Sequence, residues 1–170
     1  NLSAIMPFLE TQRLYLRLFQ ESDAHDLFRI ESNPEVMAFI RKPVTELSQS
    51  LGRIRQEAIY AAANEGLGLF ACFEKATDTY IGLVKIKHIE DTDDIEVGYA
   101  FLPEAWGKGY ATEITKKAIE YLQQNFKGRK IVAFIHSDNL SSRRVLEKAG
   151  MTEIENTYEG HEGAVVFELK

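Results

Sequence analysis

A strand, a glycine loop, a helix and a second strand follow one another in the second half of the chain, and this succession constrains the fold most. The alternating apolar segment Ile95–Phe101 is typical of a strand with one buried face, and Pro103 ends it. Residues 106–111, Trp-Gly-Lys-Gly-Tyr-Ala, then precede apolar residues at helical spacing, which Gly128 terminates. The run Ile131–Ile135 is apolar on both faces and predicts a central strand covered on both sides.

The rest of the chain predicts strands and helices of ordinary length between glycine, proline and Asx-rich turns. The expected strands cover 13–18, 69–73, 80–88, 95–101, 131–135, 151–158 and 164–169. The expected helices cover about 22–32, 46–64, 111–126 and 140–149, and the helix at 46–64 has a stripe at Leu47, Leu51, Ile54, Ala58 and Ala61 or Ala62. A chain of 170 residues with this order of elements predicts a single mixed α/β (α+β) domain.

Charge and composition exclude several classes of partner. A net charge of −6 argues against nucleic acid and anionic membranes as partners, so any bound anion must be held by local geometry. There is no long apolar run or signal-peptide pattern, which predicts a cytoplasmic protein. The single cysteine, Cys72, lies in an apolar run, where a packing role is favoured over a nucleophilic one. The histidines lack metal-ligand spacing, so we expect no metal site.

The glycine loop has two interpretations. Glycine is a poor helix former, by about 1 kcal/mol relative to alanine, so Gly107 and Gly109 could mark an ordinary turn into a helix. Alternatively, the missing Cβ atoms let the N–H groups of residues 107–112 face one anion at a helix start, where the dipole favours negative charge. Lys108 would then add charge or stay solvated. The spacing does not fit a Walker loop, because Gly109 follows Lys108 where Ser or Thr is needed, and it does not fit a dinucleotide fingerprint, because Thr112 stands where the third glycine would be.

The strand before the loop carries a carboxylate on a face of small residues. Glu96, Gly98 and Ala100 share one face of this strand, whereas the large apolar side chains share the other. Two small neighbours would leave space beside the carboxylate, as on the floor of a cleft. A solvent-facing Glu96 is the alternative.

Three segments together resemble the GNAT N-acetyltransferases, and more narrowly their RimJ/RimL-like branch. The segments are Glu-x-Gly-Tyr at 96–99, Trp-Gly-Lys-Gly-Tyr-Ala-Thr-Glu at 106–113, and Asn-x-x-Ser at 139–142 with Glu-Lys-Ala-Gly-Met at 147–151. The opening Glu-Thr-Gln-Arg-Leu-Tyr-Leu-Arg at 10–17 is also similar to that branch. The resemblance implies an N-acetyltransferase domain over residues 8–170, preceded by an extension or cloning remnant at 1–7.

The resemblance implies a mixed central sheet with helices on both faces and a splayed pair of parallel strands that binds coenzyme A. It makes the glycine loop the wrap around the pyrophosphate of acetyl-CoA, and it places the pantetheine arm beside the backbone of Phe101 to Pro103. The Phe101 amide would lie near the thioester carbonyl. The implied cofactor-side residues are Phe101, Leu102, Pro103, Trp106, Gly107, Lys108, Gly109, Tyr110, Ala111, Thr112, Asn139 and Ser142.

Two positions depart from the wider family. Trp106 stands where the loop usually opens with Gln or Arg, a variant found in the RimJ/RimL-like branch. Leu146 stands where many members place a tyrosine that protonates the departing thiolate. Ser142 matches the serine of the RimJ/RimL-like branch and is the candidate acid, although first-turn helix polarity also explains it. Asn139 is both a helix cap and the family's cofactor-side asparagine.

The expected activity is direct transfer of an acetyl group from acetyl-CoA, as co-substrate, to a primary amine, with a protein N-terminus as the favoured acceptor. Glu96 is the candidate base, because an ammonium group must lose a proton before it attacks. A small-molecule acetyltransferase for polyamines, amino sugars or antibiotics and a silent acyl-CoA-binding module are the alternatives. We expect the acceptor pocket to involve the first two helices, their connection at 39–43 and the last hairpin at 158–162. The sequence carries no signal of oligomeric state.

Overall fold

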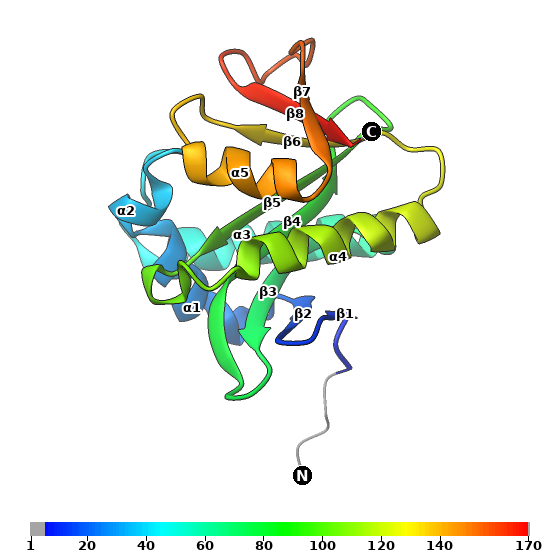
Figure 1. Ribbon diagram of the computed structural model, residues 1–170. Coiled ribbons are helices and arrows are strands. Elements are labelled where there is room, and N and C mark those ends of the chain that lie inside the picture. The colour runs from blue at the N-terminus through cyan, green and yellow to red at the C-terminus, as the bar shows by residue number, and fades with distance from the viewer. Residues whose placement is uncertain (1–5, 170) are drawn as a thin grey trace.

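The computed structural model describes residues 6–169, which form an eight-stranded sheet flanked by helices (Figure 1). Of the expected extension at 1–7, residues 1–5 lie outside the described part. The strands are β1 (Leu9–Glu10), β2 (Leu14–Leu18), β3 (Gly68–Glu74), β4 (Thr79–His88), β5 (Ile95–Phe101), β6 (Ile131–Ile135), β7 (Met151–Ile154) and β8 (Val165–Leu169). The helices are α1 (Ala24–Glu31), α2 (Pro34–Met37), α3 (Leu47–Ala63), α4 (Tyr110–Asn125) and α5 (Leu140–Lys148), with short 3₁₀ turns at Glu21–Asp23 and Pro103–Ala105. The mixed α/β prediction is confirmed.

The sheet is antiparallel except at one place near its centre. Its strand order is β1-β2-β3-β4-β5-β6-β8-β7, and only the neighbours β5 and β6 run parallel. These two strands pair through Ile95 with Ile131 and Glu96 with Val132, at their first residues. Beyond that point they diverge, and β6 lies with β8 and β7 at the top of Figure 1. The expected splayed pair of parallel strands is therefore present.

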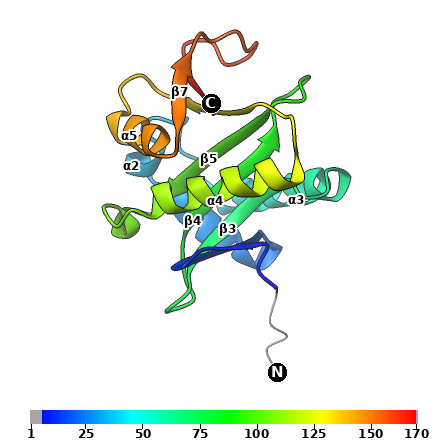
Figure 2. The ribbon, with the colours of Figure 1, turned by 45° about the vertical axis from the view of Figure 1, so that its right-hand side comes forward.

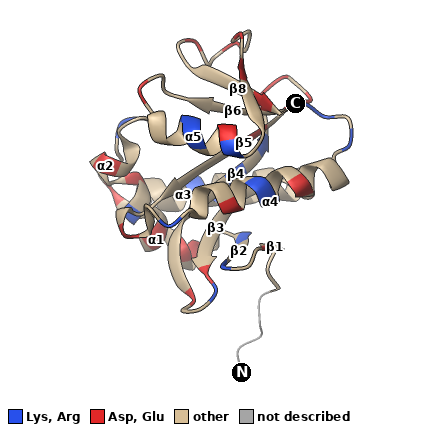
Figure 3. Ribbon diagram, in the orientation of Figure 1, with Lys and Arg blue, Asp and Glu red and all other residues tan. Residues whose placement is uncertain are grey.

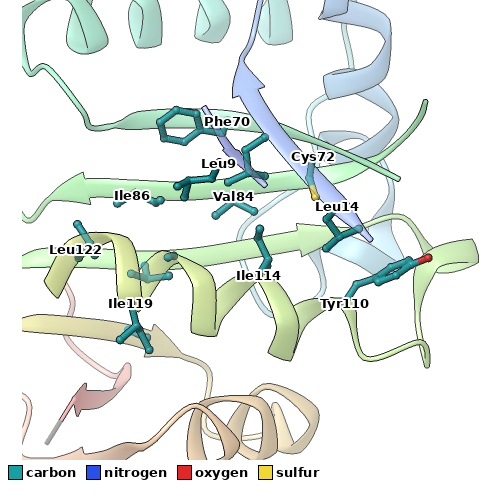
Figure 4. Packing of buried hydrophobic residues seen from close by; sticks show 14 of the residues in the cluster. Leu9, Leu14, Phe70, Cys72, Val84, Ile86, Tyr110, Ile114, Ile119 and Leu122 are labelled. Atoms are coloured by element: carbon teal, nitrogen blue, oxygen red, sulfur yellow. The ribbon is translucent and has the colours of Figure 1, made fainter. Parts of the chain in front are cut away.

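Alternation along the strands divides the core between the two faces of the sheet. In β3, Leu69, Ala71 and Phe73 belong to a cluster with α1 and α3, whereas Phe70 and Cys72 belong to the cluster under α4. Figures 1 and 2 show α4 and α3 on opposite sides of the sheet, and Figure 4 shows the packing under α4. Cys72 is fully buried, as expected of a packing residue, and burial raises the pKa of its thiol.

The apolar stripe predicted on α3 is only partly right. Ile54 is buried, but Ala58 is exposed. Ser50 and Glu57 face inward instead, because neighbouring elements offer them polar partners. The Glu57 carboxylate, for example, lies 2.9 Å from the Nζ atom of Lys87 on β4. Tertiary contacts thus override the stripe that helical spacing alone indicates.

The strand expected at 151–158 ends earlier, at Ile154. Asn156 turns the chain out of the sheet, because its side-chain amide donates to the carbonyl oxygens of His161 and Ala164. Its side-chain oxygen accepts from the N–H of Tyr158. The side chain of Asn156 therefore replaces the ladder that would have continued the strand.

A substitution at Gly82 tests the close contact between β4 and the end of β5, and a substitution at Gly52 on α3 is its control. A Cβ on Gly82 would collide with the Ala100 carbonyl oxygen, so Gly82→Ala should lower the free energy of unfolding by about 1–3 kcal/mol. A Cβ on Gly52, inside α3, meets nothing within 4 Å, so Gly52→Ala should raise it by about 0.5–1 kcal/mol. Urea unfolding measures both values. Equal effects of the two substitutions would contradict this account of β4.

Candidate functional site

The divergence of β5 and β6 opens onto a cavity of about 700 Å³. Its walls come from β5, β6, the loop before α4, and α5, and on the other side from α1, α2, the connection after α2, and α3. The glycine loop and Glu96 both line this one cavity. Most of the residues selected from the sequence are therefore brought together by the fold.

The loop needs its glycines for backbone conformation. Gly107 has φ of 75° and Gly109 has φ of 80°, both in the left-handed region that side chains disfavour. Gly109 immediately precedes the first residue of α4, so the free N–H groups of the first helical turn begin at this point. A Cβ on Gly107 would meet nothing within 4 Å. The loop is thus both a left-handed turn and an open set of donors, so the two sequence interpretations are compatible.

Trp106 ties the loop to the end of β5. Its side chain is 45% exposed, and its indole Nε1–H donates to the carbonyl oxygen of Phe101 at 2.8 Å. This hydrogen bond joins the residue that ends the strand to the residue that begins the loop. The tryptophan therefore has a positioning role that Gln or Arg would fill differently.

Residues at the N-terminus of α4 are fixed to the other half of the sheet. The Glu113 carboxylate accepts from the Thr11 hydroxyl at 2.5 Å and from Arg13 Nε at 2.8 Å. Burial opposes the ionised form of Glu113, but these hydrogen bonds outweigh it and lower the pKa of the carboxyl group. The Tyr110 hydroxyl donates to Glu74 on β3 at 2.5 Å. These contacts hold the first turn of α4, and hence its N–H donors, in one direction.

Glu96 lies inside the cavity, and the alternative of a solvent-facing side chain is wrong. Its side chain is 15% exposed, and Lys85 on β4 places its Nζ atom 3.3 Å from the Glu96 Oε1 atom. Lys85 is opposite Gly98 in the strand register, so the small residue leaves room for this ion pair. The carboxylate is thus held by a lysine beside open space.

Ser142 and Asn139 meet at the start of α5. The Asn139 side-chain oxygen accepts from the Ser142 N–H at 3.1 Å, which confirms Asn139 as a helix cap. The Tyr99 hydroxyl donates to Ser142 Oγ at 3.0 Å. Burial raises the pKa of Tyr99, which keeps the phenol protonated. Leu146, one turn further along, is buried in the same wall.

Sequence reasoning missed Tyr99 because it treated one face of β5 as wholly core. Alternation puts Tyr99 with Ile95 and Val97, which are buried. The face opens at Tyr99 because β6 has already diverged there. The expected splaying of the two parallel strands was the available signal. Residues of β5 beyond the point of divergence are predicted by it to line the cavity between the strands and not to lie in the core.

Three of the selected cofactor-side residues do not line this cavity: Leu102, Pro103 and Lys108. The Leu102 N–H already donates to the Ile81 carbonyl oxygen at 2.9 Å. Pro103 has no N–H and begins a 3₁₀ turn. Lys108 is exposed on the outside of the loop. The nine that line the cavity are Phe101, Trp106, Gly107, Gly109, Tyr110, Ala111, Thr112, Asn139 and Ser142.

The opposite side of the cavity agrees with the expected acceptor region in part. Phe39, Ile40 and Arg41, in the connection after α2, line it as expected. The last hairpin does not: His161 stacks on Phe134, with ring centroids 4.0 Å apart, and so lies behind a residue that does line it. The cationic wall residues on α5 were not selected from the sequence. Arg144 and Lys148 both line the cavity from α5, a helix with basic residues coloured blue in Figure 3. Residues four positions apart lie on the same face of a helix, and this spacing was the available signal.

Comparisons with known proteins give the chain a family. Residues 13–152 match the family model described as an acetyltransferase (GNAT) domain. The chain is 28% identical to the Uncharacterized N-acetyltransferase YoaA of Bacillus subtilis (strain 168), over 86% of this chain and 83% of YoaA. It is 31% identical to the Uncharacterized N-acetyltransferase p20 of Bacillus licheniformis, over 83% of this chain and 80% of p20.

Solved structures share the fold at lower identity. RimL, a ribosomal alpha-N-protein acetyltransferase solved with coenzyme A, matches with a TM-score of 0.79 at 16% identity, covering 96% of each chain. Spermidine N-acetyltransferase from Vibrio cholerae, solved with CoA and spermine, matches with a TM-score of 0.72 at 19% identity, over 93% of this chain and 94% of that one. Within residues 6–169, no helix has the length and apolar character needed to cross a membrane.

Proposed function

The chain belongs to the GNAT family of acetyl-CoA-dependent N-acetyltransferases, and from this premise we propose that it acetylates the α-amine at a protein N-terminus by direct transfer. One observation carries the proposal: a single cavity connects the glycine loop with Glu96 through the space between β5 and β6. Acetyl donor and amine acceptor would therefore meet without a covalent enzyme intermediate. Cys72, fully buried with a raised pKa, is unsuited to be a nucleophile.

The donor half of the cavity suits a thioester with a phosphorylated tail. The N–H groups from Gly107 to Thr112 would hold the pyrophosphate at the start of α4. Arg144 and Lys148 supply positive charge in the same wall. The pantetheine arm would extend along the diverging end of β5, where the Phe101 N–H would stabilise the negative charge that develops on the thioester oxygen.

Glu96 would accept the proton of the incoming amine. A free alkylammonium has a pKa near ~10 and carries no lone pair at neutral pH, so it must be deprotonated before it attacks. The half-buried Glu96 carboxylate lies in the cavity within reach of an amine, directly or through one water molecule. Lys85 keeps the carboxylate in position.

The departing thiolate would receive a proton from Ser142. Because Tyr99 donates its own proton to Ser142 Oγ, the serine hydroxyl hydrogen is left to point into the cavity. The serine oxygen would regain its proton from water in the cavity, and Glu96 would release to water the proton that it took from the amine, so the protons balance and Tyr99 stays protonated. Tyr99 is thus a positioning residue for Ser142.

Removing the serine hydroxyl tests this role. We expect Ser142→Ala to lower kcat by roughly tenfold or less, because a thiol with a pKa of about 8.5 leaves tolerably well without help. The affinity for acetyl-CoA should be unchanged in calorimetry. Ser137→Ala, an exposed serine just before α5, is the matched control and should behave as wild type. If Ser142→Ala turns over at the wild-type rate, Ser142 is a polar residue of the first helical turn and not the general acid.

The acceptor is tested by measuring thiol release from acetyl-CoA across N-terminal peptides, polyamines and aminoglycosides. The proposal expects the peptides to be the best substrates. Faster turnover of spermidine would favour the small-molecule alternative, which the fold shared with spermidine N-acetyltransferase also allows. Absence of release with every amine would mean a silent acyl-CoA-binding module.

A further inference from the structure

A buried carboxylate shared by two arginines forms part of the acceptor side of the cavity. Glu31, at the end of α1, is 2% exposed. Its Oε2 atom lies 2.6 Å from Arg41 Nη2 and 2.6 Å from Arg53 Nη1. Its Oε1 atom accepts from the Ser50 hydroxyl at 2.8 Å. Arg41 and Arg53 come from different elements and meet at this one group.

The cluster carries more positive charge than Glu31 can balance. Each guanidinium has five N–H donors, and both arginines direct one of them to the same carboxylate oxygen. Burial and then the positive charge of Arg53 lower the pKa of Arg41, with Glu31 only partly compensating. Glu57 lies 4.0 Å from Arg53 Nε but is already paired with Lys87 at 2.9 Å.

The same imbalance appears in the walls of the whole cavity, although the protein has a net charge of −6. Among residues 6–169, the lining carboxylates belong to Glu31, Glu35 and Glu96, and the lining cations are Arg41, Arg53, Lys85, Arg144 and Lys148. Lys85 is matched by Glu96. Arg144 and Lys148 lie on α5, on the side that we assign to acetyl-CoA. On the acceptor side, Glu31 and the exposed Glu35 equal Arg41 and Arg53 in number, but of the lining carboxylates among residues 6–169 only Glu31 forms an ion pair with these two arginines.

The two arginines are accessible from the space that Glu96 shares. The Arg41 side chain is 45% exposed and the Arg53 side chain 20% exposed, and both line the cavity. Glu31 fixes the two guanidinium groups, so little side-chain freedom would be lost when they bind a ligand. Guanidinium groups held in this way match the geometry of a carboxylate.

We propose that the acceptor amine carries a carboxylate near it, and that Arg41 and Arg53 bind this carboxylate while the amine lies at Glu96. The inference rests on the proposed acetyl transfer to an amine and narrows the acceptor to zwitterions, of which a free amino acid would replace the protein N-terminus proposed above. The carboxylate would be either the acidic side chain of a residue next to the N-terminal one or the α-carboxylate of a free amino acid. Polyamines lack such a group and would be poor acceptors.

Matched acceptor pairs test the proposal and separate the two sources of the carboxylate. The first pair is Ser-Asp-Ala-Ala-amide against Ser-Asn-Ala-Ala-amide, and the second is alanine against alaninamide. We expect the carboxylate member of one pair to have a kcat/KM at least ~10-fold higher, as suits a hydrogen bond to a charged group. Equal or lower values for the carboxylate member in both pairs, or faster acetylation of spermidine, would overturn the proposal.

A substitution then assigns the preference to these side chains. Arg41→Gln should remove most of the preference by slowing the carboxylate acceptor about tenfold and leaving its amide partner nearly unchanged. Arg55→Gln on α3, which is exposed and pairs with Glu21, is the matched control and should keep the preference. A parallel loss with both acceptors would mean that Arg41 only braces the fold, and it would overturn the assignment.

A binding measurement keeps this inference separate from the proposed function. If no amine is acetylated, the proposed function fails, but the subsite can still be measured by calorimetry with coenzyme A present. N-acetyl-Ser-Asp-amide should then bind at least ~10-fold more tightly than N-acetyl-Ser-Asn-amide to wild type but not to Arg41→Gln. Equal binding of the two ligands to wild type would overturn the inference by itself.

Discussion

Gly109→Val is expected to abolish measurable acetyl-CoA binding in calorimetry. A branched side chain at this position would stand beside the first N–H groups of α4 and prevent a phosphate from approaching them. It would also approach Arg13 Nη2, which lies 3.5 Å from an ideal Cβ on Gly109. An unchanged affinity would contradict the role of the loop as a phosphate cradle.

Gly128→Val is the control for backbone strain. Gly128 follows the end of α4 with φ of 82°, and a Cβ there meets nothing within 4 Å. Both valines must adopt a left-handed conformation, at a cost of roughly 1–2 kcal/mol each. The two variants should therefore lose similar stability in thermal unfolding, and only Gly109→Val should lose acetyl-CoA affinity. Loss of affinity in both would mean that general destabilisation is responsible.

Glu96→Gln is expected to lower kcat by ~10²–10⁴-fold at neutral pH. The substitution keeps the shape of the side chain and removes the oxygen that would take a proton from the amine. Raising the pH should recover part of the activity, because a growing fraction of the amine then arrives already deprotonated. A pH–rate profile of wild type and variant measures both effects.

Glu168→Gln is the matched control for this substitution. Glu168 lies on β8 and pairs with Lys130 at 3.6 Å, much as Glu96 pairs with Lys85 at 3.3 Å. Its replacement should leave kcat within about twofold of wild type, as for surface changes in general. Normal turnover of Glu96→Gln across the pH range would mean that another group is the base.

The strands and the loop were predictable because their signals are local. Alternation in β5 and the apolar run of β6 follow from period-two patterning, and the structure places both strands within the expected bounds. Gly107 and Gly109 could be recognised from the sequence, because two glycines before a helix indicate either a left-handed turn or a ligand that approaches the backbone closely. The cofactor side of the site depends on these local features.

The acceptor side was predictable only as a set of segments, and not as a set of side chains, because its side chains come together from positions far apart in the sequence. Arg53 lies outside the apolar stripe predicted for its helix, and only the tertiary fold places Glu31 of α1 beside it. Alternation assigns Tyr99 to the core face of its strand, but the divergence of β6 opens its surroundings. Such juxtapositions depend on tertiary packing, which overrides the periodicity of single elements.

The most direct test of the account is mass spectrometry on a reaction of the protein, acetyl-CoA and the peptide Ser-Asp-Ala-Ala-amide. The account expects one free coenzyme A for each peptide acetylated on its α-amine, with the mass of the protein unchanged throughout. Glu96→Gln should slow both products equally. A protein that becomes acetylated before the peptide does, or that releases coenzyme A without acetylating any amine, would contradict direct transfer through this cavity.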